Sequence, residues 1–258
     1  MKKASTPVFW TGLLLLGAIL LWWAAIALGS AAGLPVAQGE RLTFGIVVSL
    51  GMVAVTSFLS LRQPPWPSWL PLSGSAFRQI GLGVLAYAGL ILIATGAAVL
   101  AGFVRIEFAP APEAVQKAGY LLALVLLSEA LPEELLFRGW LMQALAARRS
   151  PWPAIFGQAG LFTGFAWVMG GLGSLQDASF IFCFGLMLGV VRAATGSVWA
   201  PMGVHLAFIT AQQAALPQWQ IWSADPHWVA QTICLTLVPF SVVVALLFDR
   251  VRPQPDPG

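Results

Sequence analysis

The chain has 258 residues, of which 59% are hydrophobic and only 9% are charged, and its formal net charge is +3. This number of polar side chains is too small to cover the surface of a soluble protein of this size. The composition therefore excludes a soluble fold and predicts a membrane protein. In a membrane protein the positions of Lys and Arg indicate which loops lie on the cytoplasmic side of the membrane. They do not indicate a nucleic-acid partner, and none is expected.

Eight apolar stretches are long enough to cross a hydrocarbon core of about 30 Å, which takes roughly 20 helical residues. Segments rich in proline and polar residues, such as "RQPPWPSWLPLSGS", separate them. The pattern predicts an all-α polytopic transmembrane bundle of about eight helices, forming one domain over residues 1–250 before a short disordered tail at 251–258. The predicted spans are 8–31, 43–61, 79–103, 118–146, 152–170, 177–194, 197–214 and 228–248.

The basic residues predict the orientation of these spans. If the amino terminus is cytoplasmic, most Lys and Arg in the connections lie on the cytoplasmic side, and only Arg41, Arg105 and Lys117 lie outside. This asymmetry satisfies the positive-inside rule and predicts that both termini are cytoplasmic. The first apolar run is longer than that of a signal peptide, so we expect it to be a retained anchor.

Two pairs of glycines are spaced four residues apart, at a spacing that lets membrane helices approach closely. One pair is Gly160 and Gly164, and the other is Gly185 and Gly189. They predict that the fifth and sixth spans lie in the interior of the bundle.

The fourth span contains the charges that are hardest to explain. Its segment "SEALPEELLFRGWL" carries Glu129, Glu133, Glu134 and Arg138 among apolar residues. On an α-helix Glu129 and Glu133 share one face, and Glu134 and Arg138 form a second pair that can neutralise itself. A charge at the bilayer centre costs about 2.5 to 3.5 kcal/mol on insertion scales, so the carboxylates without a cation are candidates for function.

The depth of these acids also follows from the sequence. Glu133 lies about 22 Å of helix away from Arg148, the first clearly cytoplasmic residue, which places it inside the membrane toward the cytoplasmic half. Pro132 frees the carbonyl of Ser128 and predicts a kink just before the acids. Such a kink can open a wet cavity in which a carboxylate acts as general base toward water.

Two histidines are present, and one of them lies at membrane depth. His205 falls in the middle of the seventh span and is a functional candidate, whereas His227 follows "ADP" in a loop that we predict to lie outside. Cys183 and Cys234 lie in apolar runs and do not predict a metal site.

These residues resemble a known family, the CPBP intramembrane proteases, also called the type 2 CAAX prenyl endopeptidase or Abi family. The resemblance covers about residues 118–213. "EELLFR" is similar to the first family motif, and "GLMLGVVRAATGSVWAPMGVHLAF" is similar to the third, with His205 on its histidine. The sequence departs from the family twice, since Trp167 stands where we place the second-motif histidine and Ile209 stands where the family usually has Asn or Asp.

The resemblance implies roles for individual residues. It implies Glu133, Glu134 and His205 as catalytic residues, with Glu133 as general base and His205 as donor to the oxyanion. Arg138, Glu129 and Trp167 would support the site. If a metal binds, Glu133 and His205 are its candidate ligands and zinc is the candidate metal, although a catalytic zinc normally takes three protein ligands.

Three functions remain open from the sequence. The first is an intramembrane endopeptidase that cuts a peptide bond near the cytoplasmic side. The second is an inactive pseudoprotease that binds a hydrophobic peptide, a lipid or a membrane-protein partner, and the third is a small-molecule transporter. The expected location is the cytoplasmic membrane as a multi-pass protein, with membrane lipids and a peptide or membrane protein as partners. Whether the chain is an active enzyme is left open.

Overall fold

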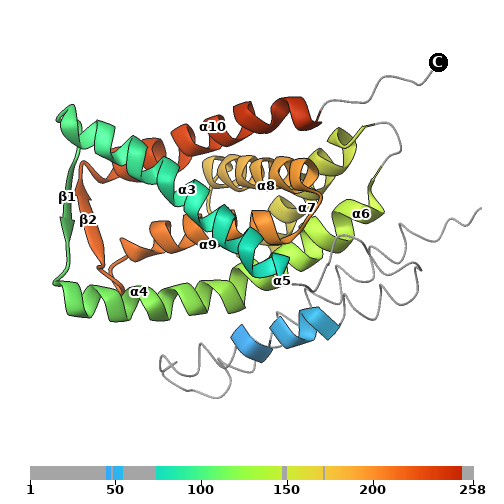
Figure 1. Cartoon of the computed structure of the whole chain (residues 1–258), viewed down its shortest axis with the longest axis horizontal. Coiled ribbons are helices and arrows are strands. Elements are labelled where there is room, and N and C mark those ends of the chain that lie inside the picture. Colours follow the sequence, from blue (N-terminus) through green and yellow to red (C-terminus); the bar gives the residue numbers. More distant parts are fainter. Residues whose placement is uncertain (1–44, 48, 55–73, 147–149, 171, 252–258) are drawn as a thin grey trace, which may run out of the picture.

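The computed structural model describes residues 45–47, 49–54, 74–146, 150–170 and 172–251. In these ranges the regular elements are helices, apart from one two-stranded sheet, which confirms the predicted all-α membrane bundle (Figure 1). The predicted first span, most of the second, both termini and the tail after residue 251 lie outside the described residues. The count of eight spans, the single domain and the cytoplasmic termini therefore stay predictions.

The six later spans each correspond to a helical segment of the structure. The segment that carries the acids is continuous, because α4, η1, α5, η2 and α6 follow one another without a break from Ala111 to Ala144. The helices are α3 (Ser75–Leu100), α4 (Ala111–Val125), η1 (Leu126–Ala130), α5 (Leu131–Glu133), η2 (Glu134–Leu141), α6 (Met142–Ala144), α7 (Trp152–Val168), α8 (Leu175–Thr195), α9 (Trp199–Ala214), η3 (Val229–Leu237), α10 (Val238–Leu247) and η4 (Phe248–Val251).

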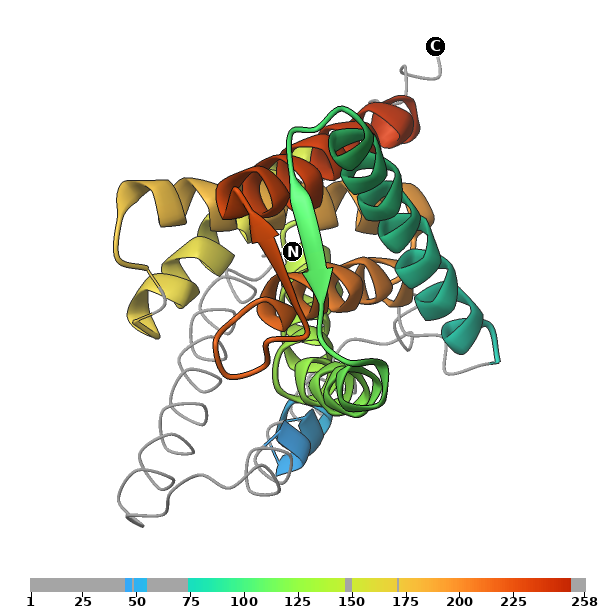
Figure 2. The same ribbon diagram turned by 90° about the vertical axis from the view of Figure 1, so that its left-hand side faces the viewer.

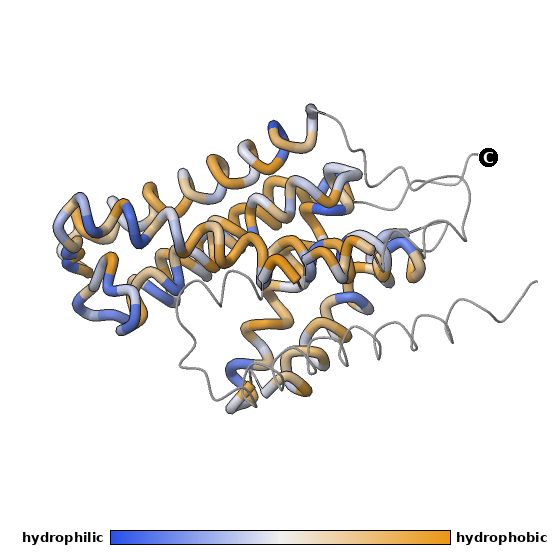
Figure 3. Tube along the Cα trace, turned by 90° about the horizontal axis from the view of Figure 1, so that it is seen from below, coloured by the Kyte–Doolittle hydropathy of each residue, from blue (hydrophilic) through white to orange (hydrophobic). Residues whose placement is uncertain are grey.

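Length and composition distinguish the helices that can cross a membrane alone. Among the described residues, three segments are long and apolar enough, and they are Ser75–Leu100, Leu175–Thr195 and Val229–Val251. Hydrophobic residues run along all the described helices (Figure 3). The shorter α9 lies among the others and packs on α3, α4 and α8, and its residues from Pro201 to Leu206 are all buried. The bundle therefore encloses the helix that carries the candidate histidine.

The sheet joins two connections on the same end of the bundle (Figure 2). Strand β1 (Arg105–Phe108) lies between α3 and α4, and β2 (Trp222–Asp225) lies between α9 and η3. They pair antiparallel, with Arg105 opposite Asp225. The sequence analysis predicted no strands, because four-residue strands in loops between long apolar runs have no clear alternating pattern.

The turn between α8 and α9 is short because of one glycine. Gly196 ends α8 with φ of 69°, in the left-handed region that costs glycine little, and its N–H donates to the carbonyl of Arg192. At the other end of α8, the hydroxyl of Ser174 accepts a hydrogen bond from the N–H of Asp177. The left-handed turn at Gly196 accounts for the close succession of the sixth and seventh predicted spans, and the Ser174 cap fixes the start of α8.

The glycine pairs behave differently from one another. A Cβ at Gly189 would lie 2.6 Å from Nε2 of Gln158, and one at Gly185 would lie 3.1 Å from Cα of Ala159, so these two glycines do allow α8 to approach α7 closely. At Gly160 and Gly164 a Cβ would meet nothing within 4 Å. Close approach of helices therefore occurs at the second pair and not at the first, and the interior position of the fifth and sixth spans stays a prediction.

The closest helix crossing was not predicted. Gly83 of α3 and Gly203 of α9 face each other's helices, and a Cβ on either would overlap a backbone carbonyl oxygen, of Ala200 and Ile80 respectively. The two glycines are far apart in the sequence, so no local spacing indicated their contact. Since Gly203 is two residues from His205, this crossing fixes the position of the candidate histidine.

We expect Gly203→Ala to destabilise the protein by about 1 to 3 kcal/mol, because the new methyl group would overlap backbone atoms that cannot move as a side chain can. The matched control is Gly160→Ala in α7, where the methyl group meets open space and alanine is favoured in a helix by up to about 1 kcal/mol. Unfolding midpoints in detergent should fall for the first variant and not for the second. Equal midpoints would contradict the close crossing of α3 and α9.

Candidate functional site

The helix that carries the acids changes its winding on both sides of Pro132. Residues Leu126–Ala130 and Glu134–Leu141 form π-helical turns, and the short α5 lies between them. Pro132 has no N–H to give to the carbonyl of Ser128, and π turns of this kind are often found at functional sites. The sequence predicted a kink here; the structure shows a change between α and π winding at this place, and the kink itself stays a prediction. Every residue from Glu134 to Leu141 is buried.

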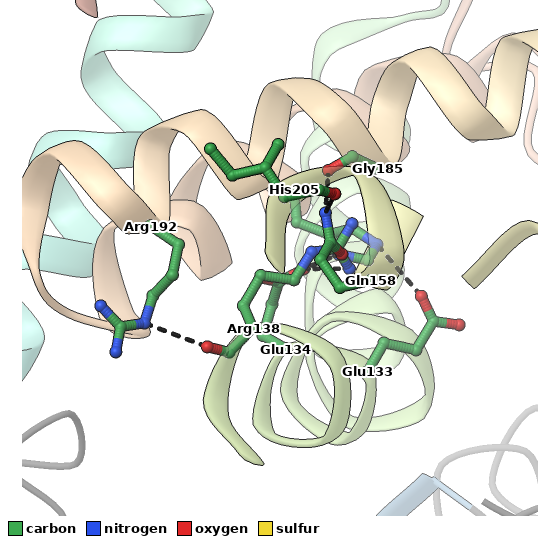
Figure 4. A network of polar contacts seen from close by, with 8 residues as sticks. Glu133, Glu134, Arg138, Gln158, Gly185, Arg192 and His205 are labelled. Carbon is green, nitrogen blue, oxygen red and sulfur yellow. Dashed lines mark hydrogen bonds and ion pairs between the residues drawn. The ribbon is translucent and has the colours of Figure 1, made fainter. Parts of the chain in front are cut away.

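Glu134 and Arg138 form the predicted ion pair. Nη1 of Arg138 donates to Oε1 of Glu134 at 3.0 Å, and both side chains are completely buried. The guanidinium also lies over the ring of Phe162 in α7, with its carbon 4.5 Å from the ring centre. From α8, Nε of Arg192 donates to the backbone carbonyl of Arg138 at 3.0 Å (Figure 4). The pair is therefore held by neighbours from two other helices.

His205 connects the two adjacent glutamates. Its Nδ1 lies 2.8 Å from Oε1 of Glu134, and its Nε2 lies 3.8 Å from Oε2 of Glu133 (Figure 4). A carboxylate at 2.8 Å accepts a hydrogen bond, which assigns a proton to Nδ1 and leaves Nε2 facing Glu133. The structure thus brings Glu133, Glu134, Arg138 and His205 together in one cluster.

The imidazole is held in place by aromatic side chains. The ring of Phe184 in α8 meets His205 edge to face, with centroids 4.9 Å apart at 85°. Phe184 in turn packs on Phe208 and Phe240, and Tyr87 of α3 joins this cluster. His205 itself is 1% exposed, whereas the side chain of Glu133 is 15% exposed. Glu133 is therefore the more exposed member of the pair.

Glu129 has a partner that the sequence analysis missed. Nε2 of Gln213 in α9 donates to Oε1 of Glu129 at 2.8 Å. Gln213 lies eight residues after His205, which is about two helical turns on the same face, and Glu129 lies one turn before Glu133. The two spacings differ and Gln213 lies outside the motifs, so no sequence signal pointed to this contact.

Trp167 is not in this cluster, so its expected role beside the acids is corrected. The side chain is 71% exposed and lines an open hollow with Thr163, Gly164, Leu172, Gly173, Ser174 and Ala178. The face of α7 toward the acids carries Phe162 and Phe165, whose rings lie 5.0 and 5.5 Å from that of Phe137. Five residues after Phe162 correspond to about 500°, so Trp167 points about 140° away from that face.

The donor set for a metal is incomplete. Among the described residues, no group of three or more His, Cys, Asp and Glu side chains could hold a metal ion. Glu133 and His205 bring two donor atoms to one place, and a catalytic zinc normally takes three protein ligands. These residues therefore do not make a zinc site by themselves. His227 lies outside the cluster, stacked on Trp222 beyond β2.

Residues 116–211 match the model of the family described as type II CAAX prenyl endopeptidase Rce1-like. The match spans all the clustered residues named above except Gln213, which follows its end by two positions. No curated protein and no solved structure matches the chain. The family match confirms the resemblance that the first and third motifs indicated. Over these residues the chain is similar to that family, and three of the described helices are long and apolar enough to cross a membrane.

Proposed function

We propose that the chain is an intramembrane endopeptidase in which Glu133 is the general base for attack of water on a peptide bond. The observation that carries the proposal is the position of His205, with Nδ1 on Glu134 and Nε2 directed at Glu133. At 3.8 Å the second contact is too long for a direct hydrogen bond, and its geometry suits one water molecule that bonds to both groups.

In the proposed reaction, the Glu133 carboxylate takes a proton from the water as its oxygen attacks the carbonyl carbon of the substrate. The carbonyl π bond opens to an oxyanion, and in its imidazolium form His205 donates from Nε2 to that oxygen. Glu133 then gives the proton to the amide nitrogen, the C–N bond breaks, and an acid and an amine leave. Because Glu134 accepts from Nδ1, it fixes the ring for this step as a positioning residue.

The proposed location is the cytoplasmic membrane, with the site toward the cytoplasmic half. Supporting this depth, Arg192, which the positive-inside rule assigns to the cytoplasmic end of its helix, donates to the carbonyl of Arg138. Arg138 in turn lies about one helical turn from Glu133 on the same continuous helix.

The proposal is tested by incubating the purified protein in detergent or liposomes with a library of apolar peptides in water enriched in ¹⁸O. We expect products whose new carboxyl group has taken one oxygen from the solvent, as attack by water requires. Mass spectrometry measures both the cleavage position and the label. Peptides that stay intact with and without added zinc and other divalent metals would contradict the proposal.

A second candidate function is a pseudoprotease that binds a hydrophobic peptide or a membrane-protein partner without cutting it. The specific observation in its favour is that α7 presents Phe162 and Phe165 toward the acids, and that Ile209 lies one turn after His205. None of these three side chains can accept or donate a proton. For this function, binding should occur without products and should persist in Glu133→Gln.

A further inference from the structure

The charges of the clustered residues do not balance. Glu129, Glu133 and Glu134 lie within two helical turns, and among the described residues Arg138 and, when protonated, His205 are the cations paired with them. That guanidinium bonds to Glu134, so this pair is neutral by itself. Arg192 contributes its Nε to a backbone carbonyl instead of a carboxylate. In the imidazolium form that the proposed reaction uses, His205 faces Glu133, so the carboxylate that remains is that of Glu129, which the proposed chemistry does not use.

The remaining carboxylate, that of Glu129, is held in place by a neutral group. Gln213 donates one N–H to Oε1 at 2.8 Å, which orients the carboxylate but adds no positive charge. Both side chains are half-buried, so they are neither enclosed in the core nor free in the surroundings. A carboxylate oriented this way can offer its other oxygen to a donor from a bound molecule.

Exposure along the helix indicates the side from which a molecule reaches the site. From Glu134 to Met142 every residue is buried, whereas Glu129, Leu131 and Glu133 are half-buried. A ligand that reaches Glu133 therefore passes on the side of Glu129.

We propose that Glu129, oriented by Gln213, determines specificity by binding a lysine or arginine side chain of the peptide next to the bond that the water activated by Glu133 attacks. This inference rests on the proposed function only in assigning the ligand as a peptide. A cationic side chain would supply the positive charge that the cluster lacks, and in a partly desolvated site such pairing discriminates strongly against neutral side chains.

The spacing limits which peptide residue can make this contact. Glu129 and Glu133 are four residues apart, or about 6 Å along the helix axis, and residues of an extended peptide rise about 3.3 Å each. The cation should therefore lie within about two residues of the scissile bond. The contact is thus a selection for a basic residue close to the cleavage position.

Measurements of peptide binding test this role of Glu129 without requiring cleavage. In the Glu133→Gln background, we would measure the affinity of matched alanine- and leucine-rich fluorescent peptides that differ only in carrying lysine or norleucine at one position. We expect the lysine peptide to bind on the order of 10- to 100-fold more tightly, and Glu129→Gln to remove this preference. Glu129→Asp keeps the charge and should retain part of it, and Glu113→Gln on the exposed face of the same helix should leave it unchanged.

Unfolding midpoints of all variants would show that a lost preference does not reflect a lost fold. A parent that binds neither peptide, or binds both equally, would overturn the inference, and so would a preference that survives Glu129→Gln in a folded protein. Cleavage of the peptides is measured separately from binding. A preference for lysine without any cleavage would contradict the proposed endopeptidase and leave this binding role intact.

Discussion

Replacing Arg138 by methionine should lower the free energy of unfolding by about 3 to 5 kcal/mol, one of the largest losses that a single substitution in this chain can cause. The guanidinium is completely buried and is bonded to an equally buried Glu134. Without it, the buried carboxylate loses its permanently charged partner, while methionine keeps the apolar contact with Phe162. Equilibrium unfolding in mixed micelles of mild detergent and dodecyl sulfate measures the loss.

The structure offers a matched control on the same continuous helix. Glu113 and Lys117 also form an ion pair four residues apart, at 2.6 Å, but their side chains are 58% and 32% exposed. Because exposed helical pairs contribute only about 0.3 to 0.5 kcal/mol, Lys117→Met should change the stability by no more than that. Adding Glu134→Gln to Arg138→Met should recover part of the stability, since the buried charge is then gone. If Arg138→Met and Lys117→Met cost the same, the burial of the first pair is wrong.

The helices could be predicted from the sequence where they correspond to long apolar runs. Spans such as 177–194 and 197–214 were found to within a few residues as α8 and α9, because long apolar runs and the glycine turn at Gly196 mark them clearly. The acid-bearing helix begins at Ala111 instead of 118, since Pro112 in its first turn starts the helix before the apolar run does. The π-helical turns were not predicted because winding depends on packing that no local pattern records.

Among the clustered residues, the sequence allowed a prediction only for those whose side chains are energetically costly to place in a membrane. Buried acids and one mid-span histidine are rare enough to single out Glu133 and His205, and the structure does bring them together. Trp167 was assigned by counting along a motif, and the helical phase of α7 turns it away. Gln213 carries no charge and lies outside the motifs, so only the three-dimensional contact with Glu129 reveals it.

Glu133→Gln should lower the rate of cleavage without lowering stability, whereas Arg138→Met should lower stability. The amide cannot take a proton from water, so we expect the rate of peptide cleavage to fall by about 10² to 10⁴. Stability should stay the same or rise, because Glu133 lies beside two other carboxylates on the same helix, and a neutral isostere removes that repulsion. Cleavage rate and unfolding in the same detergent give both quantities.

Measuring both the cleavage rate and the stability distinguishes a catalytic role of Glu133 from a structural one. A residue that merely holds the bundle together would lose stability when changed, and cleavage would fall with it. A residue that destabilises the resting protein in order to act on substrate loses activity and not stability when it is neutralised. Glu113→Gln, an exposed carboxylate on the same helix, should alter neither quantity beyond about 0.5 kcal/mol. Cleavage that continues unchanged in folded Glu133→Gln would remove the general base from the proposed mechanism.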